Sequence, residues 1–404
     1  KINHSYYVNL YKAAFTNAIN QNSRTIIKGN RMRSHVEASS KNSFAKNEAS
    51  AHKPLKIVNV AVAVIYYQHQ YLLGFRNASQ HQGNRYEFVG GKIDANETAQ
   101  QALIREVAEE TGIDIENNTA VKLGRLHHDY GDKQVCLQVY KVALSAQQYE
   151  QHRHCQQRLE GQALTWVDKS KLLAGDYQLP AANKTILAWL RLPQQIAITY
   201  PLAHFNDAAD PAAWLRFHAA HLAHDAWVYV RPKAMDADNN IAQLLRLRAD
   251  IQAIVPAEFE SDQAHKQAIN HQIVAKQLTQ TQLIRGLSDI NNDVHQSKNA
   301  IHDDLLNYPL IVSCHDVESV AAANKLAHRR LEQQLPPVIG IFLSPVLATQ
   351  THPDVEPLGW QAWSILAELA DMPVIGLGGL SPSMRAQAEQ YGGIAVAGIR
   401  QFLR

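Results

Sequence analysis

The chain has 404 residues, of which 46% are hydrophobic and 19% charged, and this length predicts two domains rather than one. The formal net charge of +2 is too small for bulk electrostatic attraction, so we expect no direct binding to nucleic acid or a membrane. The three cysteines form no C-x-x-C pair, which argues against a disulfide framework or a zinc knuckle and predicts a cytoplasmic protein.

Residues 1–54 are rich in Asn, Ser and Lys, and their acidic residues are Glu37 and Glu48. Because no apolar periodicity is visible, we expect a disordered extension. A basic, serine-containing and acid-poor leader also resembles an organelle transit peptide, which is the alternative.

Residues 55–195 alternate between strand-like and helical runs, which predicts an α/β or α+β domain. A helix is expected at 95–111, with Asn96 as its N-cap and Gly112 as the left-handed residue that ends it. The other expected elements are strands at 57–67, 71–75, 121–126, 135–144 and 164–167 and a closing helix at 183–192.

Residues 192–195 (LPQQ) are expected to form a linker to a second domain at 196–404. There, short apolar runs alternate with polar helical stretches, a pattern compatible with a (β/α)8 barrel. Among these runs are strands expected at 196–199, 226–230, 310–313, 338–343, 373–377 and 394–397 and helices expected at 317–335 and 360–370.

Residues 91–113 fit the pattern G-x5-E-x7-R-E-U-x-E-E-x-G-U, where U is a bulky aliphatic residue. A chance match in a chain of this length has odds on the order of one in ten million, so we prefer a functional interpretation to a solvated helix face. The matching residues are Gly91, Glu97, Arg105, Glu106, Val107, Glu109, Glu110, Gly112 and Ile113.

Glu106, Glu109 and Glu110 stand at i, i+3 and i+4, so they project from one helix face. Carboxylates crowded in this way repel each other unless a cation lies between them, and Mg²⁺ favours carboxylate, water and phosphate oxygens. Such a metal could neutralise a diphosphate, with one glutamate as general base for the attacking water. Arg105 could orient a glutamate or bind phosphate.

The segment is identified as a Nudix box, and residues 57 to about 192 resemble the MutT branch, the 8-oxo-dGTP diphosphatases, which implies an α/β/α sandwich. The resemblance extends beyond the box to Arg76 at the end of the second strand. Residues 86–93 (YEFVGGKI) are similar to L-E-F-P-G-G-K-I, residues 160–162 match E-G-Q, and residues 179–183 (LPAAN) are similar to F-P-P-A-N. Val89 replaces the usual proline, which bears on specificity more than on catalysis.

The resemblance implies hydrolysis of 8-oxo-dGTP to 8-oxo-dGMP and pyrophosphate with Mg²⁺, or Mn²⁺, as cofactor. Glu106 would be the base, and Asn183 would read the oxidised purine, although that residue could equally be a helix N-cap. Another nucleoside diphosphate or a thiamine-related pyrophosphate is the alternative substrate. The implied metal ligands are Gly90, Glu106, Glu109, Glu110 and Glu160, and the implied substrate-binding residues are Arg76, His81, Phe88 and Asn183.

Residues from about 198 to 404 resemble the thiamine phosphate synthase/TenI family of TIM barrels. The similar runs include R-x-K at 231–233, SCHD at 313–316 and the segment 373–402. The resemblance implies a phosphorylated ligand bound by the late loops, at Gly378, Gly379, Gly398 and Ile399.

Several residues depart from the second family. The segments 255–261 and 277–283 lack the metal-binding aspartates, His352 replaces a phosphate-binding lysine, and Pro345 replaces a histidine. An active synthase and a degenerate barrel kept for stability or ligand sensing therefore both stay open.

His218, His221 and His224 recur at every third residue. We interpret them as a polar helix surface in preference to a metal site, because no carboxylate completes a recognisable ligand motif.

Overall fold

The computed structural model describes residues 57–79, 83–131, 133–154, 163–205, 210–233, 236–260, 268–291, 303–350 and 354–403. Leu55–Arg404 forms one compact unit. The expected extension at 1–54 lies outside the described residues, as do His81 and Glu160.

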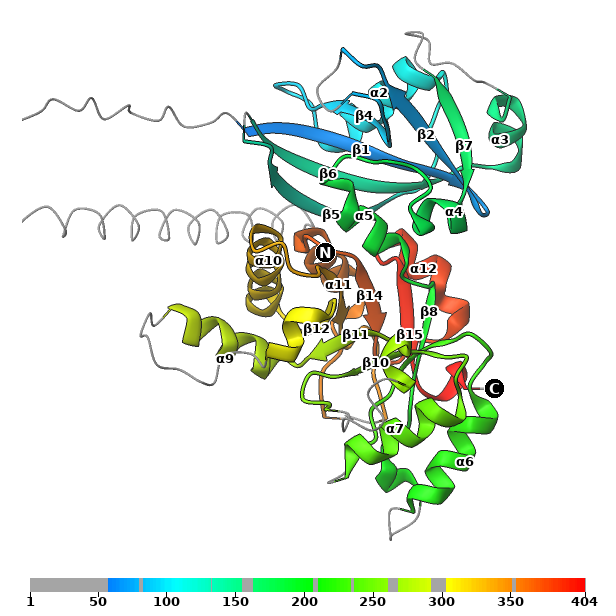
Figure 1. Cartoon of the computed structure of the whole chain (residues 1–404), viewed down its shortest axis with the longest axis vertical. Helices are drawn as coiled ribbons and strands as arrows, with labels where there is room; N and C mark the ends of the chain where they lie inside the picture. The colour runs from blue at the N-terminus through cyan, green and yellow to red at the C-terminus, as the bar shows by residue number, and fades with distance from the viewer. Residues whose placement is uncertain are drawn as a thin grey trace, which may run out of the picture. The chain divides into compact units, whose positions relative to one another are not determined.

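Residues 57–190, here called the sheet region, contain a mixed seven-stranded sheet. Its strand order is β3-β2-β1-β6-β5, with β4 paired to β1 and β7 paired to β2. β1 and β6 run parallel, and the other neighbours are antiparallel (Figure 1). The elements are β1 (Ile57–Tyr67), β2 (Gln70–Arg76), β3 (Arg85–Glu87), β4 (Val89–Lys92), α2 (Ala99–Thr111), β5 (Ala120–Asp129), β6 (Gln134–Ala143), α3 (Ala146–His152), β7 (Leu164–Asp168), α4 (Lys169–Ala174) and α5 (Asn183–Leu190).

Helices cover both faces of this sheet, because alternate residues of β1 point to opposite sides. Ala61, Ala63 and Ile65 pack in one core cluster with Leu103 and Val107 of α2. Val62 and Val64 belong to the other cluster, together with Ile186 and Trp189 of α5. The sheet region is therefore an α/β/α sandwich with α2 and α5 on opposite faces.

The helix that carries the glutamates begins later than the sequence predicts. Thr98, not Asn96, is the N-cap of α2. The Thr98 hydroxyl accepts from Gln101 N at 3.2 Å, and the Gln101 side chain accepts from Thr98 N at 2.8 Å. This reciprocal capping box satisfies two donors, which the single Asn96 amide could not do. The end at Gly112, with φ of 73°, agrees with the prediction.

Short elements were harder to anticipate than long ones. The sequence patterns predicted no strands at β3 and β4, where the Gly90-Gly91 pair weakens the strand pattern, and no helices at α3 or α4. The longer strands and α5 appear within a few residues of their expected ends.

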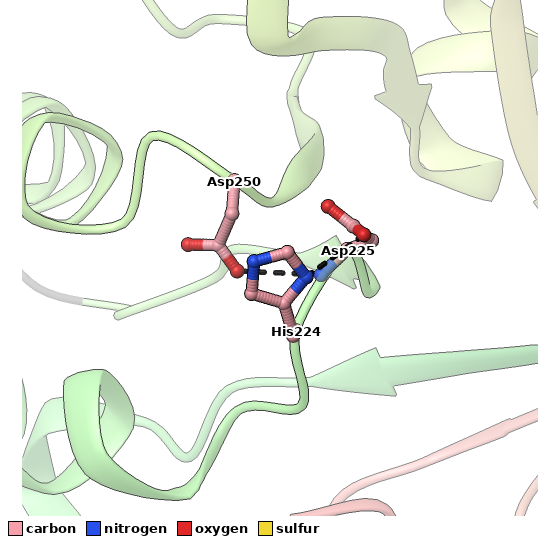
Figure 2. Close-up of side chains that lie close together, drawn as sticks. All are labelled: His224, Asp225 and Asp250. Carbon is pink, nitrogen blue, oxygen red and sulfur yellow. Dashed lines mark hydrogen bonds and ion pairs between the residues drawn. The ribbon is translucent and has the colours of Figure 1, made fainter.

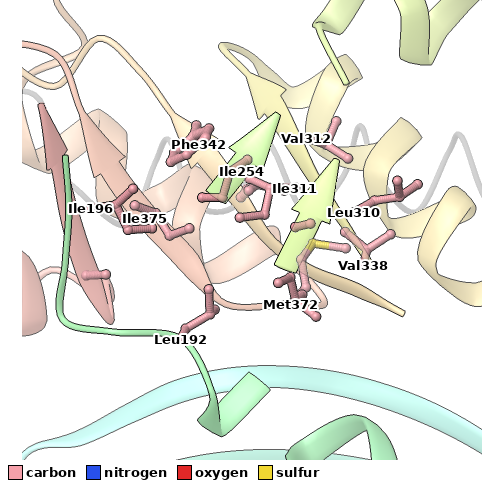
Figure 3. Packing of buried hydrophobic residues seen from close by; sticks show 14 of the residues in the cluster. Leu192, Ile196, Ile254, Leu310, Ile311, Val312, Val338, Phe342, Met372 and Ile375 are labelled. Carbon is pink, nitrogen blue, oxygen red and sulfur yellow. The ribbon is translucent and has the colours of Figure 1, made fainter. Parts of the chain in front are cut away.

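Residues 195–398, here called the barrel, form a closed parallel barrel of the expected type (Figure 1). Figure 3 shows Ile254, Ile311 and Phe342 among the buried side chains that pack around its strands. The strands are β8 (Gln195–Ile198), β9 (Trp227–Tyr229), β10 (Gln252–Pro256), β11 (Ile273–Leu278), β12 (Leu310–Cys314), β13 (Val338–Leu343), β14 (Val374–Leu377) and β15 (Ala395–Gly398).

Helices and turns connect the barrel strands. The connections after β14 and β15 contain short 3₁₀ turns. The elements are η1 (Leu202–His204), α6 (Pro211–His221), α7 (Ala237–Leu247), η2 (Asn270–Gln272), α9 (Gln280–Asn291), η3 (Asp303–Asn307), α10 (Val317–Glu332), α11 (Gly359–Leu369), η4 (Pro382–Met384), α12 (Arg385–Gln390) and η5 (Arg400–Phe402).

The interpretation of three histidines as a polar helix surface is wrong for His218. Its side chain is fully buried, its Nδ1 bonds to Trp214 O and its Nε2 accepts from Tyr200 N. Burial lowers the pKa of His218 to about 4. α6 ends at His221, so His224 lies beyond the helix.

Within the described ranges, no helix combines the length and the apolar character that a bilayer crossing requires.

We predict that Thr98→Ala lowers the free energy of unfolding by about 1 kcal/mol, because the capping box is lost. Asn96→Gly should cause no loss, because Asn96 has a φ of 113° that glycine adopts without strain. Urea unfolding followed by circular dichroism measures both. Equal destabilisation by the two substitutions would contradict the assignment of Thr98 as the cap.

Candidate active site

The carboxylate of Glu106 lies directly against the backbone of β4. A Cβ atom added to Gly91 would lie 2.1 Å from Glu106 Cδ, so the Glu106 carboxylate leaves no space for a side chain at position 91. Gly90 has a φ of +153°, and a Cβ atom on it would lie 2.1 Å from Ala61 O. The two glycines therefore let β4 approach α2 on one side and β1 on the other.

Arg105 holds the acidic side chains around it. Its Nε and Nη2 donate to the two carboxylate oxygens of Glu97 at 3.2 and 2.6 Å. Its Nη1 donates to Glu106 at 2.9 Å and to Glu109 at 3.1 Å. These contacts raise the pKa of Arg105 above its usual range, and the hydrogen bond from Arg105 lowers the pKa of Glu97. Of the two roles that the sequence left open for Arg105, this geometry favours orienting the glutamates.

Glu110 reaches the same glycine pair, since Gly90 N donates to its Oε2 at 3.3 Å. Glu109 is more exposed, with 57% of its side chain accessible. The carboxylates of Glu106, Glu109 and Glu110 do not all lie within 4.8 Å of one another. Like charges repel, and Arg105 and Gly90 N attract the carboxylates in different directions. The three side chains therefore extend from one helix face without meeting at a common point.

Arg76, at the end of β2, forms an ion pair with Glu87 of β3. Burial raises the pKa of Tyr130, in the hairpin between β5 and β6, while the charge of Arg76 lowers it and that of Glu87 raises it. The hydroxyl of Tyr130 also bonds to the backbone of Ala182, the residue before Asn183. This bond joins the hairpin to the start of α5.

Asn183 is buried at the first position of α5. The N-cap of that helix is Ala182, so the alternative interpretation of Asn183 as an N-cap is not what the structure shows. Among the described residues, its side-chain amide forms no hydrogen bond. Phe88 is buried in the same core cluster as Ala182 and Ile186.

Sequence reasoning missed Glu87 and Tyr130 as neighbours of the expected substrate residues. Both lie outside the 91–113 motif, and no spacing rule links them to Arg76 or Asn183. Tyr130 is brought to the site by hairpin pairing between β5 and β6, which is a tertiary effect. His81 and Glu160 were expected at the site but lie outside the described residues.

The late glycines lie at the carboxyl end of the barrel strands. Gly378 and Gly379 follow β14 with φ values of +98° and +69°. Cβ atoms on them would lie 2.7 Å from Pro345 Cα and 2.7 Å from Ala348 O, respectively. Gly398 ends β15, and Ile399 precedes η5. Ligand-binding loops of parallel barrels occupy this end.

Two basic side chains follow β9 at the same end of the barrel. The Arg231 guanidinium lies 5.9 Å from the centroid of the Tyr229 ring. Burial and the charge of Arg231 both lower the pKa of Lys233. Within the ranges that the structure covers, neither side chain forms an ion pair, so an anion would relieve their mutual repulsion.

His224, Asp225 and Asp250 are the three residues whose potential ligand atoms lie within 4.8 Å of one another in the described part of the chain (Figure 2). His224 Nδ1 lies 2.8 Å from Asp225 Oδ2, and both side chains are more than 70% exposed. Asp250 pairs with Arg248 at 2.7 Å, which lowers the pKa of Asp250. Asp225 and Asp250 are already paired, with His224 and Arg248 respectively, and His224 and Asp225 are exposed. We therefore assign no metal ion to this group.

A family model described as a NUDIX domain matches residues 60–189. The chain is 30% identical over 138 residues to an 8-oxo-dGTP diphosphatase of Escherichia coli (strain K12), covering 34% of this chain and 98% of the relative. It is 38% identical over 88 residues to an 8-oxo-dGTP diphosphatase of Proteus vulgaris, covering 22% of this chain and 77% of the relative.

A shorter alignment matches a protein of Aquifex aeolicus (strain VF5) that is provisionally named thiamine-phosphate synthase 2. The identity is 33% over 63 residues, which covers 16% of this chain and 34% of the relative. This partial match does not assign the barrel to a family. For the sheet region, the matching family model agrees with the two relatives, of which the chain covers 98% and 77%, and the chain belongs to the Nudix hydrolase family.

Proposed function

We propose that this chain is a Mg²⁺-dependent nucleoside triphosphate pyrophosphohydrolase that prefers 8-oxo-dGTP and releases 8-oxo-dGMP and pyrophosphate. The observation that carries the proposal is the Glu106 carboxylate, which lies against Gly91 and accepts a hydrogen bond from Arg105. The names of the Escherichia coli and Proteus vulgaris relatives support the choice of substrate. The biological role would be to cleanse the cytoplasmic nucleotide pool and so protect DNA replication.

The donor set suits Mg²⁺ or Mn²⁺. Because a Cβ atom on Gly91 has no room beside Glu106, the carboxylate is held next to the backbone of the Gly90-Gly91 pair. Hard cations prefer such oxygen donors, and a cation could draw together carboxylates that now point apart. When bound, it would neutralise charge on the diphosphate. The residues that we propose as its ligands are Gly90, through its carbonyl, Glu106, Glu109, Glu110 and Glu160.

Glu106 is the general base in this proposal. Arg105 donates to its Oε1, so we assign Oε2 to accept the proton of the attacking water. The water oxygen adds to phosphorus, the bridging P–O bond breaks, and pyrophosphate leaves. Arg105 keeps Glu106 oriented throughout, because its other hydrogen bonds to Glu97 and Glu109 fix its guanidinium.

The purine would be bound near the start of α5. The Asn183 amide can donate one hydrogen bond and accept another, which is what distinguishing an oxidised guanine edge requires. Arg76, held by Glu87, would bind phosphate, while Phe88 and His81 would complete the substrate site. Another nucleoside diphosphate, or a thiamine-related pyrophosphate, is the alternative substrate.

For the second part of the chain, divided from the first near residue 195, we propose a phosphate-binding barrel without synthase activity. The observation that favours it is the pair of basic side chains at Arg231 and Lys233, which form no ion pair among the described residues. The backbone N–H groups of the late loops would bind the same phosphate. The loop residues are Gly378, Gly379, Gly398 and Ile399.

We predict that Glu106→Gln lowers kcat for 8-oxo-dGTP by about 10²–10⁴-fold, because the base is lost while the side-chain shape is kept. Circular dichroism should show an unchanged fold. Glu116→Gln, at an exposed site after α2, is the matched control and should retain activity. A rate for Glu106→Gln equal to that of wild type would exclude this mechanism.

Asn183→Ala should reduce the preference for 8-oxo-dGTP over dGTP by about tenfold, because one or two hydrogen bonds to the oxidised purine are lost. The preference is the ratio of the two kcat/KM values, measured by pyrophosphate release. Asn117→Ala, an exposed asparagine, is the control. If the ratio stays constant in Asn183→Ala, the purine is read elsewhere.

Calorimetry should detect binding of thiamine phosphate or inorganic pyrophosphate to the full chain in the absence of Mg²⁺, and Arg231→Ala should weaken it by at least tenfold. Glu106→Gln should bind the same ligand unchanged, since its substitution lies outside the barrel. Absence of heat with both ligands would remove the support for a barrel phosphate site.

A further inference from the structure

The barrel occupies the free edge of the sheet in the sheet region. β5 ends the strand order, so its outer backbone groups need partners elsewhere. Arg125 N of β5 donates to the carbonyl of Asp371, just before β14, at 3.1 Å. The Arg125 guanidinium also binds the Asp371 carboxylate, with Nε and Nη2 at 2.9 and 2.8 Å from Oδ1. The barrel therefore continues the hydrogen bonding of the sheet at one point.

Lys122 and Gly124 of β5 also contact the barrel. The Lys122 ammonium donates to the carbonyl of Glu368, near the end of α11, where a cation is favoured. Gly124 lies at a register shift of β5. A Cβ atom on it would lie 2.6 Å from Asp371 O and 2.7 Å from the Trp189 ring, so any side chain would force the parts of this contact apart.

Helix α5 is fixed to the barrel at one end and reaches the candidate purine site at the other. The buried Trp189 donates from Nε1 to the carbonyl of Val338, the first residue of β13, at 3.1 Å. Asn183 lies six residues earlier, about 9 Å along a rigid helix. A helix of eight residues is not stable alone, so its direction depends on the packing of its buried residues, of which Trp189 bonds to the barrel.

These contacts all involve the amino-terminal end of the barrel strands. Val338 begins β13, and Asp371 precedes β14. The glycine loops follow the opposite, carboxyl ends of β14 and β15. Among the described residues, these contacts therefore come from the end of the barrel opposite the glycine loops.

From these contacts we infer that the barrel positions the nucleotide-recognition helix, and that Trp189 is the positioning residue through which it aligns Asn183. The inference rests on the proposed function, since it assigns Asn183 to the nucleotide. It gives the barrel a role in substrate affinity that needs no barrel ligand. Because a displacement of about 1 Å in a recognition group changes its hydrogen bonds, loosening Trp189 should affect binding before chemistry.

Trp189→Phe tests this role, because it keeps an aromatic side chain but removes the Nε1–H donor. Trp363→Phe is the matched control: Trp363 is also buried and donates to Leu343 O, at the other end of the same strand, at 3.0 Å. Asp371→Asn is a milder second variant that weakens the ion pair with Arg125. Kinetics are measured on whichever nucleotide the wild-type chain hydrolyses best, and hydrogen exchange is measured for the amides of α5.

We expect Trp189→Phe to raise KM at least threefold with kcat within twofold, and to speed exchange in α5. Asp371→Asn should shift KM in the same direction by less, and Trp363→Phe should leave KM unchanged. An unchanged KM in Trp189→Phe, or an equal rise in Trp363→Phe, overturns the inference. Failure of wild type to prefer 8-oxo-dGTP would refute only the proposed substrate, because the comparison of variants uses the best substrate found.

Discussion

The ionic contacts of Arg105 are the constraint on which the acidic face of α2 depends. One guanidinium binds Glu97, Glu106 and Glu109, and Glu106 in turn lies against Gly91. Without that positive charge, adjacent carboxylates would repel one another and rotate into solvent. The arrangement is therefore organised around an arginine, with Glu106 and Glu110 beside the Gly90-Gly91 pair of β4 and Glu109 more exposed.

The sandwich places the proposed metal ligands and the proposed purine-binding residue over two faces of the same strand. Residues of β1 alternate between the cluster under α2, which carries the carboxylates, and the cluster under α5, which carries Asn183. Because the strand is buried from both sides, small shifts on one face are resisted by packing on the other. In the proposed function, the residues for hydrolysis and for recognition are thus separate in sequence but pack on a single shared strand.

Much of this could be predicted from local patterns. The spacing of Glu106, Glu109 and Glu110 places them on one face because helical periodicity depends only on near neighbours. The start of α2 was misplaced, because Asn96 and Thr98 are both good caps and only Thr98 has a reciprocal partner. Long-range contacts could not be predicted in this way, because no local pattern relates Arg125 to Asp371, which is 246 residues away. Substrate and ligand choice remain proposals because they depend on molecules that leave no periodic pattern in a sequence.

Gly124, at the edge of the sheet, has no room for a side chain because Asp371 of the barrel and Trp189 of α5 both lie against it. In a hydrolase that stands alone, the Trp189 ring would still lie beside this position, but it could shift to make room for a small side chain. With the barrel docked, the carbonyl of Asp371 lies on the same glycine and Trp189 is held by its hydrogen bond to Val338. Docking of the barrel thus restricts position 124 to a hydrogen atom, a signature that could distinguish docked from merely tethered relatives.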